Sequence, residues 1–329
     1  MLDAFDLRPQ EHPQQRREDG LGQPVAHAAP PVRVARHVAT DDPRRLADPG
    51  QSPAPLVTPW LSPPDHLPAE RPLEPAVSSP VLPGAEPIDL PGGPVGVLLS
   101  HGFTGTTQSM RPWAEHLSGA GLSVSAPRLP GHGTTWQDMN TTTWQDWYAE
   151  LERSFDAMRA RCDTVFVMGL SMGGTLTLRL AELRPAQVAG IVVVNTSLAS
   201  DRKDARLAPV LSKVVPSFPG VGSDIKKEGV TELAYTRVPL KAFVSLRRAW
   251  PVVRADLAKI TCPVLVYRSS VDHVVEPVSG RALLAGLAGG IVEERVLENS
   301  YHVATLDNDA PTIFDGSLAF VRAHAPAAA

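Results

Sequence analysis

The chain has 329 residues and a formal net charge of −4, so it can bury a sizeable core and carries no cationic excess. This charge balance excludes a typical nucleic-acid-binding protein. No apolar run reaches the roughly 18 residues of a membrane span, and the N-terminus lacks the apolar stretch of a secretory signal. We therefore expect no integral membrane segment and a cytoplasmic location. Cys162 and Cys262 each adjoin a predicted strand, which favours buried apolar residues over a disulfide, and no Cys or His spacing indicates a metal site.

Residues 1–80 form a segment of unusual composition. The first 94 residues contain 20 of the 33 prolines and no lysine, and neither helical nor strand periodicity persists among them. This composition predicts a disordered, proline-rich leader. An over-extended gene start is the alternative, because Ala, Arg and Pro all have GC-rich codons. A short apolar-polar-apolar run at 88–90 predicts a first edge strand after the leader.

From Val95 onward, apolar runs of strand length alternate with segments of helical pattern. The alternation predicts an α/β fold in residues 81–325, with a mostly parallel sheet and helices on both faces. Right-handed crossovers place the carboxyl ends of the strands on one edge of that sheet. The expected strands cover 95–100, 122–126, 164–169, 189–195, 263–268 and 291–297. The expected helices cover 109–120, 142–160, 172–184, 277–288 and 309–323.

The stretch from Gly169 to Gly173 reads G-x-S-x-G. A β-branched apolar run at 164–168 precedes it, and leucines at helical spacing follow it over 175–183. A serine between strand and helix in this pattern is typical of a nucleophile elbow, so Ser171 is the predicted nucleophile. A chance match in a glycine-rich turn is the alternative, and the strand-to-helix context argues against it.

A nucleophilic serine needs a base, and the base needs a carboxylate to orient it. Asp272 follows the predicted strand 263–268, and His302 lies between the last strand and the last helix. The chain order Ser, Asp, His is one in which catalytic triads occur. A solvated turn aspartate and an exposed loop histidine are the alternatives. The order and the shared edge of the sheet favour Asp272 as the orienting acid and His302 as the base.

Backbone amides are the predicted stabilisers of an oxyanion. The strand at 94–100 ends in small residues around Phe103, and Met172 directly follows the nucleophile. We therefore expect the amides of Phe103 and Met172 to form the oxyanion hole. His101 precedes the nucleophile strand and His132 lies in a tight Gly-flanked loop, so both are interpreted as structural residues rather than bases.

An insertion of about 198–256 interrupts the alternation of strands and helices. It is too long for a tight connection, and its apolar residues follow an amphipathic pattern. We expect a cap of about two helices over the active-site edge, which would select substrate and exclude water. A surface insertion without function is the alternative.

Taken together, these motifs resemble those of the bacterial carboxylesterase and monoacylglycerol lipase group of α/β-hydrolases, over roughly residues 94–324. The string Asn299 to Asp307 is the most specific of them. The resemblance is carried by residues 96–105, 108–113, 129–133, 169–173, 271–275 and 299–307, and it extends into the insertion at 222–226 and 232–235.

The resemblance implies an α/β-hydrolase fold and a serine hydrolase that converts monoacylglycerol to glycerol and fatty acid, with no cofactor. It implies that Val221 and Glu232 in the cap shape the glycerol end of the pocket. A general short-chain carboxylesterase, a thioesterase and an acyltransferase of the same fold are the alternatives. The expected partner is a small ester substrate, and the cap is compatible with transient contact with a lipid surface.

Overall fold

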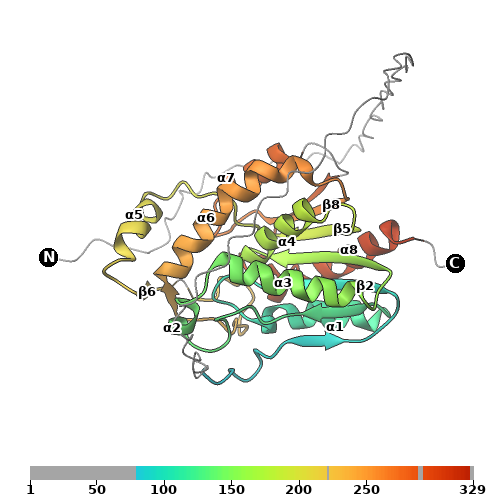
Figure 1. Cartoon of the computed structure of the whole chain (residues 1–329), viewed down its shortest axis with the longest axis horizontal. Coiled ribbons are helices and arrows are strands. Elements are labelled where there is room, and N and C mark those ends of the chain that lie inside the picture. The colour runs from blue at the N-terminus through green and yellow to red at the C-terminus, as the bar shows by residue number, and fades with distance from the viewer. Residues whose placement is uncertain (1–78, 221, 288–291, 327–329) are drawn as a thin grey trace, which may run out of the picture. The chain divides into compact units, whose positions relative to one another are not determined.

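A computed structural model describes residues 79–220, 222–287 and 292–326, so the predicted leader lies almost wholly outside the described residues. The sheet has seven strands in the order β1-β3-β2-β4-β5-β8-β9. β1 pairs antiparallel with β3, and all other neighbours are parallel (Figure 1). The strands are β1 (Ile88–Leu90), β2 (Val95–Ser100), β3 (Ser123–Ala126), β4 (Thr164–Leu170), β5 (Gly190–Val194), β8 (Val264–Ser269) and β9 (Val292–Leu297).

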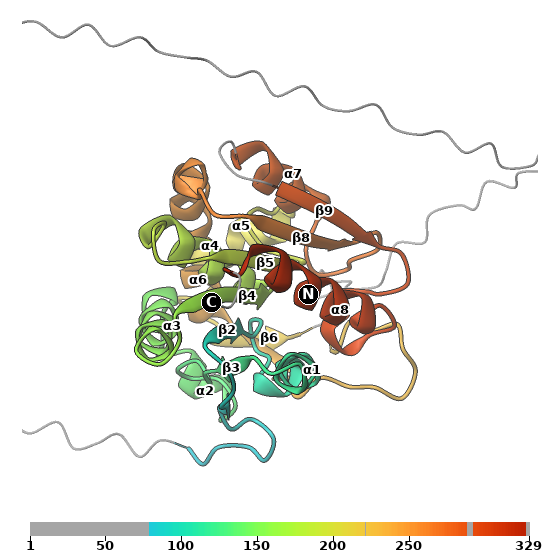
Figure 2. The same cartoon turned by 90° about the vertical axis from the view of Figure 1, so that its right-hand side faces the viewer.

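Helices cover both faces of this sheet (Figure 2). Because side chains alternate along a strand, Val97 and Leu99 of β2 enter the apolar cluster with α1 and α8, while Leu98 enters the opposite cluster with α3, α4, α6 and α7. Burial on both faces explains why the central strands are continuously apolar. The helices are α1 (Arg111–Gly119), α2 (Trp136–Met139), α3 (Trp144–Arg159), α4 (Met172–Leu183), α5 (Lys203–Leu211), α6 (Leu240–Asp256), α7 (Pro277–Gly286) and α8 (Ala310–His324), with 3-10 turns at Thr107–Met110, Leu257–Lys259 and Ala304–Leu306.

The predicted fold class is confirmed, and each predicted strand and long helix is present within two residues of its expected ends. The edge strand at 88–90 is also present. The turn at 107–110 and the short helix α2 were not predicted, because each has only four residues and no measurable periodicity. Cys162 and Cys262 are buried and free, as expected.

The insertion between β5 and β8 contains α5, a two-stranded antiparallel sheet and α6. The small sheet, β6 (Ser217–Pro219) with β7 (Arg237–Pro239), was not predicted because its strands are only three residues long and each ends in proline. Its neighbour α6 belongs to two clusters. The first turns of α6 pack with α5, whereas Leu246, Trp250 and Val253 enter the main core. In Figure 1, α5 lies at the far end of this insertion, beyond α6.

Among the described residues, none of the helices combines the length and the apolar character that crossing a bilayer requires.

Candidate active site

Ser171 lies on a sharp turn between β4 and α4. Its φ of 56° and ψ of −115° are strained values for a residue with a side chain. A Cβ at Gly169 would collide with the carbonyl of Gly173, and a Cβ at Gly173 would collide with the carbonyl of Ser100. Only glycine therefore fits on either side of Ser171. The elbow geometry predicted from the sequence is present.

Asp272 and His302 meet at the same edge of the sheet. His302 Nδ1 donates to Asp272 Oδ2 over 2.8 Å, and both side chains are almost fully buried. The other oxygen of Asp272 accepts from the backbone N–H groups of Val274 and Val275 at 2.8 and 2.7 Å. These bonds fix the carboxylate, which in turn fixes the imidazole with its Nε2 free to accept a proton.

The pKa of His302 reflects two opposing influences. Burial lowers it, but the charge and the hydrogen bond of Asp272, with smaller contributions from Asp224 and Glu232, raise it above the ordinary value. The surrounding carboxylates therefore favour the protonated form of the His302 imidazole.

Asn195 connects the ends of β5 and β8 to the histidine loop. It follows β5 with a positive φ of 46° and is buried. Its Nδ2 donates to the carbonyl of His302 at 2.8 Å and to Ser269 Oγ at 2.9 Å, while Ser171 N–H donates to the carbonyl of Val194 at 2.9 Å. Sequence reasoning missed this residue. A polar Asn directly after an all-valine strand end was the available signal.

The loop after β2 passes beside the nucleophile. A Cβ at Gly102 would lie 3.6 Å from the Cβ of Ser171. The Phe103 ring packs edge-on against Trp147 and beside Phe243, which anchors the loop to α3 and α6. Met172 is the first residue of α4, where backbone N–H groups have no partner within the helix. The two predicted amide donors, of Phe103 and Met172, thus lie on segments that adjoin Ser171.

His101 and His132, which are interpreted from the sequence as structural residues, are both buried beside the loop that carries Phe103. His101 Nε2 accepts from the N–H of Leu129 at 3.2 Å, and its Nδ1 donates to the carbonyl of Gly102 at 3.0 Å. Burial lowers the pKa of His101 to about 4. Burial also lowers the pKa of His132, whose ring packs edge-on against His101 and Trp147.

Glu232 approaches the site from the insertion. A Cβ at Gly105 would collide with its carboxylate, so the Glu232 side chain lies directly against the loop that carries Phe103. Burial raises the pKa of Glu232 to about 7. The nearby His302 and a hydrogen bond from Ser109 lower this pKa, but by less than burial raises it. Val221, the other residue assigned to the glycerol end, lies outside the described residues.

The segment 222–236, which we call the arm, is joined to the site through two buried aspartates that sequence reasoning missed. Asp307 accepts from the backbone N–H groups of Lys226 and Lys227 in the arm at 2.7 and 2.9 Å, and from that of Tyr301 at 2.8 Å. Asp224, within the arm, accepts from the N–H of His302 at 3.1 Å. Both residues lie in motifs that carried the family resemblance, and that was the only sequence signal for them.

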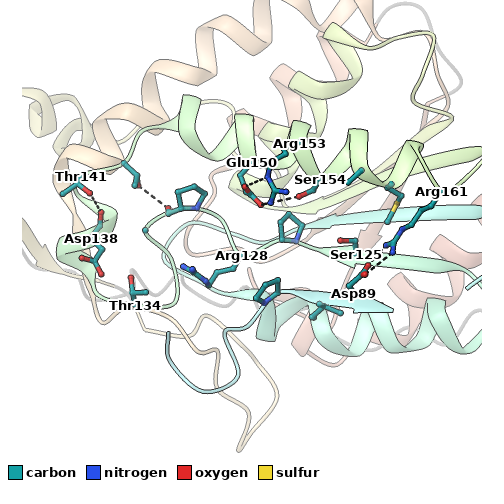
Figure 3. Close-up of a pocket in the computed structure, with 18 residues that line it drawn as sticks. Asp89, Ser125, Arg128, Thr134, Asp138, Thr141, Glu150, Arg153, Ser154 and Arg161 are labelled. Atoms are coloured by element: carbon teal, nitrogen blue, oxygen red, sulfur yellow. Dashed lines mark hydrogen bonds and ion pairs between the residues drawn. The ribbon is translucent and has the colours of Figure 1, made fainter. Parts of the chain in front are cut away.

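A surface cavity of about 890 Å³ lies apart from these residues, along β1, β3 and α3. Figure 3 shows that four of its charged side chains face one another in pairs, Arg161 with Asp89 and Arg153 with Glu150. Ser171, Asp272 and His302 do not line it. It is therefore not the site at which the elbow serine would act.

A serine on a strand-to-helix elbow and a buried Asp–His pair at the same edge of a mostly parallel sheet define an α/β-hydrolase. A family profile described as serine aminopeptidase, S33, matches residues 95–309. The chain therefore belongs to this family of α/β-hydrolases.

Individual similar proteins show which activities are known among the relatives of this chain. A thermostable monoacylglycerol lipase of Bacillus sp. (strain H-257) is 46% identical over 247 residues, which cover 75% of this chain and 98% of the relative. A carboxylesterase of Bacillus subtilis (strain 168) is 25% identical over 239 residues, which cover 72% of this chain and 96% of the relative. A solved structure described under LipS and LipT, two metagenome-derived lipolytic enzymes, has 45% identity and a TM-score of 0.72, covering 74% of this chain and all of that one. The chain is thus a serine hydrolase whose homologues include lipases and carboxylesterases.

Proposed function

We propose that this enzyme hydrolyses monoacylglycerols to glycerol and fatty acid through an acyl-enzyme on Ser171. The observation that carries the proposal is the strained elbow of Ser171 at the same sheet edge as the buried Asp272–His302 pair. The 46% identity to a monoacylglycerol lipase, over nearly the whole of that relative, supports this substrate class.

The reaction follows from the roles of these groups. His302 removes the proton of Ser171 as the hydroxyl oxygen attacks the ester carbonyl, and the amides of Phe103 and Met172 stabilise the oxyanion. His302 then protonates the departing glycerol oxygen. In the second step His302 activates a water molecule, which hydrolyses the acyl-enzyme and releases the fatty acid. Asp272 holds the imidazole in the required tautomer throughout.

Glu232 is proposed to bind the glycerol end of the substrate. Its carboxylate lies against Gly105, beside the predicted oxyanion loop, and its backbone N–H donates to Ser223 Oγ at 2.7 Å. A carboxylate accepts hydrogen bonds from hydroxyl groups, so it suits a glycerol that still carries two free hydroxyls. Val221 is proposed to line the same end.

A general short-chain carboxylesterase is the second candidate, and the B. subtilis carboxylesterase relative favours it. Thioesters and acyl transfer to another acceptor would use the same acyl-enzyme, so the triad does not distinguish them. The distinction lies in the pocket rather than in the reacting groups.

The test is hydrolysis of p-nitrophenyl esters from acetate to palmitate beside 1-monolauroylglycerol and dilaurin, with Ser171→Ala as the control. Turnover of the monoacylglycerol without the diacylglycerol, lost in Ser171→Ala, is the expected result. Activity on short p-nitrophenyl esters alone would replace the lipase proposal with the carboxylesterase. Full activity in Ser171→Ala would overturn both.

We further propose transient contact with lipid through α5 and the turn after it. Leu207, Val210 and Val214 are 60%, 69% and 78% exposed and follow one another at helical spacing. An exposed apolar stripe of this kind suits the surface of a lipid aggregate. Vesicle co-sedimentation tests the contact, and cell fractionation tests the expected cytoplasmic location.

A further inference from the structure

Asp224 joins two loops that carry the proposed acid and base. Its Oδ2 accepts from the backbone N–H of His302 at 3.1 Å and from that of His273 at 3.2 Å. Its Oδ1 accepts from His273 Nδ1 at 2.8 Å. Its own carbonyl accepts from the N–H of Val303 at 3.1 Å. One residue of the arm therefore binds His302 and Val303 on one loop and the residue after Asp272 on the other.

The Asp224 carboxylate is buried, and the donors that satisfy it are two backbone amides and the His273 ring. A buried carboxylate held in this way is oriented on several sides, so it constrains the groups that donate to it. The His273 ring is itself held edge-on against Tyr301, the residue before His302. The contacts around Asp224 thus fix the chain directly on either side of the base.

We propose that Asp224 is a positioning residue of the hydrolytic reaction, which locks the His302 loop against the Asp272 loop and supplies a second negative charge to the imidazolium. The inference rests on the proposed function, because it takes His302 as the base.

The electrostatic part of the proposal has a defined sign. Three carboxylates act on His302: that of Asp272, after β8, and those of Asp224 and Glu232, from the arm. A further titratable group, the His273 imidazole, contacts the Asp224 carboxylate and the ring of Tyr301. Each carboxylate favours the charged imidazole. Loss of the Asp224 charge therefore lowers the pKa of His302, and the acid limb of kcat/KM moves to lower pH.

The experiment compares Asp224→Asn with Asp307→Asn on p-nitrophenyl butyrate across the acid limb. Asp307 is a matched control, because it is a second buried carboxylate that binds the same arm and the same loop through Tyr301, but it is not among the groups that shift the pKa of His302. For Asp224→Asn we expect kcat to fall about tenfold to a hundredfold with little change in KM. We expect its acid limb to move down by about one pH unit. For Asp307→Asn we expect the acid limb to keep its wild-type position.

Two further measurements secure the interpretation. Burial raises the pKa of Glu232 to about 7, so Glu232 can itself titrate across the acid limb. The comparison is therefore repeated in the Glu232→Gln background, where the same downward shift is expected. Asp224→Glu, which restores the charge, is expected to return the acid limb towards the wild-type position. If Asp224→Asn does not fold, Asp224→Ser replaces it, because a serine hydroxyl still accepts one backbone hydrogen bond without a charge.

An acid limb that stays at its wild-type position in Asp224→Asn, with a loss of kcat no larger than in Asp307→Asn, would overturn the proposal. That result would leave the proposed function intact as long as Ser171→Ala is inactive. Full activity in Ser171→Ala would instead remove the basis of both.

Discussion

The two parts of the insertion, the arm at 222–236 and the helix α5, differ in how they meet the rest of the enzyme. The arm exchanges hydrogen bonds with several separate segments of the hydrolase domain. These bonds reach Thr104 and Gln108, the loop at 131–134, the loops of His273 and His302, and Asp307. α5 instead packs Ala208 against Leu240 and Val244 of α6 and exposes large apolar side chains.

The difference shows that an insertion can serve two purposes at once. Buried, charge-assisted hydrogen bonds hold the arm against the loops of His273 and His302. The described side chains of α5 make their apolar cluster with α6, and those that are exposed are available to a second apolar surface. We therefore expect substitutions in the arm to change catalysis and stability, and substitutions on α5 to change only interfacial behaviour.

Ser171→Ala is expected to cause the largest loss of kcat among these variants, and the effects of substitutions in the arm and in α5 are compared with it. Removal of the nucleophile is expected to lower kcat on the order of 10⁶-fold, as in triads that act as a unit. The elbow backbone should stay intact, because alanine has the same Cβ as serine and the close backbone contacts of Gly169 and Gly173 are unchanged. Single-turnover hydrolysis of p-nitrophenyl butyrate, with circular dichroism as the folding control, measures this loss.

Asp307→Ala tests the fixed attachment of the arm. It leaves the backbone N–H groups of Lys226, Lys227 and Tyr301 without their buried acceptor, so the free energy of unfolding should fall by about 3 kcal/mol. Urea denaturation measures the change. A loss as small as that of an α5 surface variant would mean that the arm is no more firmly attached than α5.

The pH dependence of kcat/KM tests whether carboxylates of the arm act on His302. Burial lowers the pKa of His302 but the carboxylate of Asp272, with those of Asp224 and Glu232, raises it overall above its ordinary value of 6.5. Because the base must be neutral, kcat/KM should be lost as pH falls through that raised pKa, and the midpoint should lie above 6.5. A midpoint below that value in the wild type would contradict this account of the carboxylates.

Leu207→Ser on α5 should have the smallest effect. The side chain is 60% exposed, so the free energy of unfolding should change by no more than about 0.5 kcal/mol, and kcat on a dissolved short ester should stay at the wild-type value. Retention on phosphatidylcholine vesicles should decrease. If replacement of Leu207, Val210 and Val214 together by serine leaves retention on vesicles unchanged, the proposed lipid contact is wrong.

Sequence reasoning located the elements and the proposed triad because these depend on local patterns. The run Val165 to Met168 predicts a buried strand wherever it occurs, and the chain order of Ser171, Asp272 and His302 follows from the topology of the sheet. The roles of Asn195, Asp224 and Asp307 depend on hydrogen bonds between residues far apart in the chain. A single sequence contains no spacing rule for such bonds.

The helix α6 packs both with α5 and with the main core, and this limits how the enzyme can be engineered. Exchange of the whole insertion at 198–256 for that of a relative would also remove Leu246, Trp250 and Val253 from the main core. Each of these positions at which the relative's residue leaves a cavity costs about 2–5 kcal/mol, so a chimera with these limits should be less stable than either parent. A graft that ends at Pro239 keeps α6 whole, and its success then depends on the first turns of α6, where Leu240 and Val244 meet α5. The part of the insertion that carries Glu232, the residue proposed to bind glycerol, can thus be exchanged at this boundary, while the helix itself stays with the host.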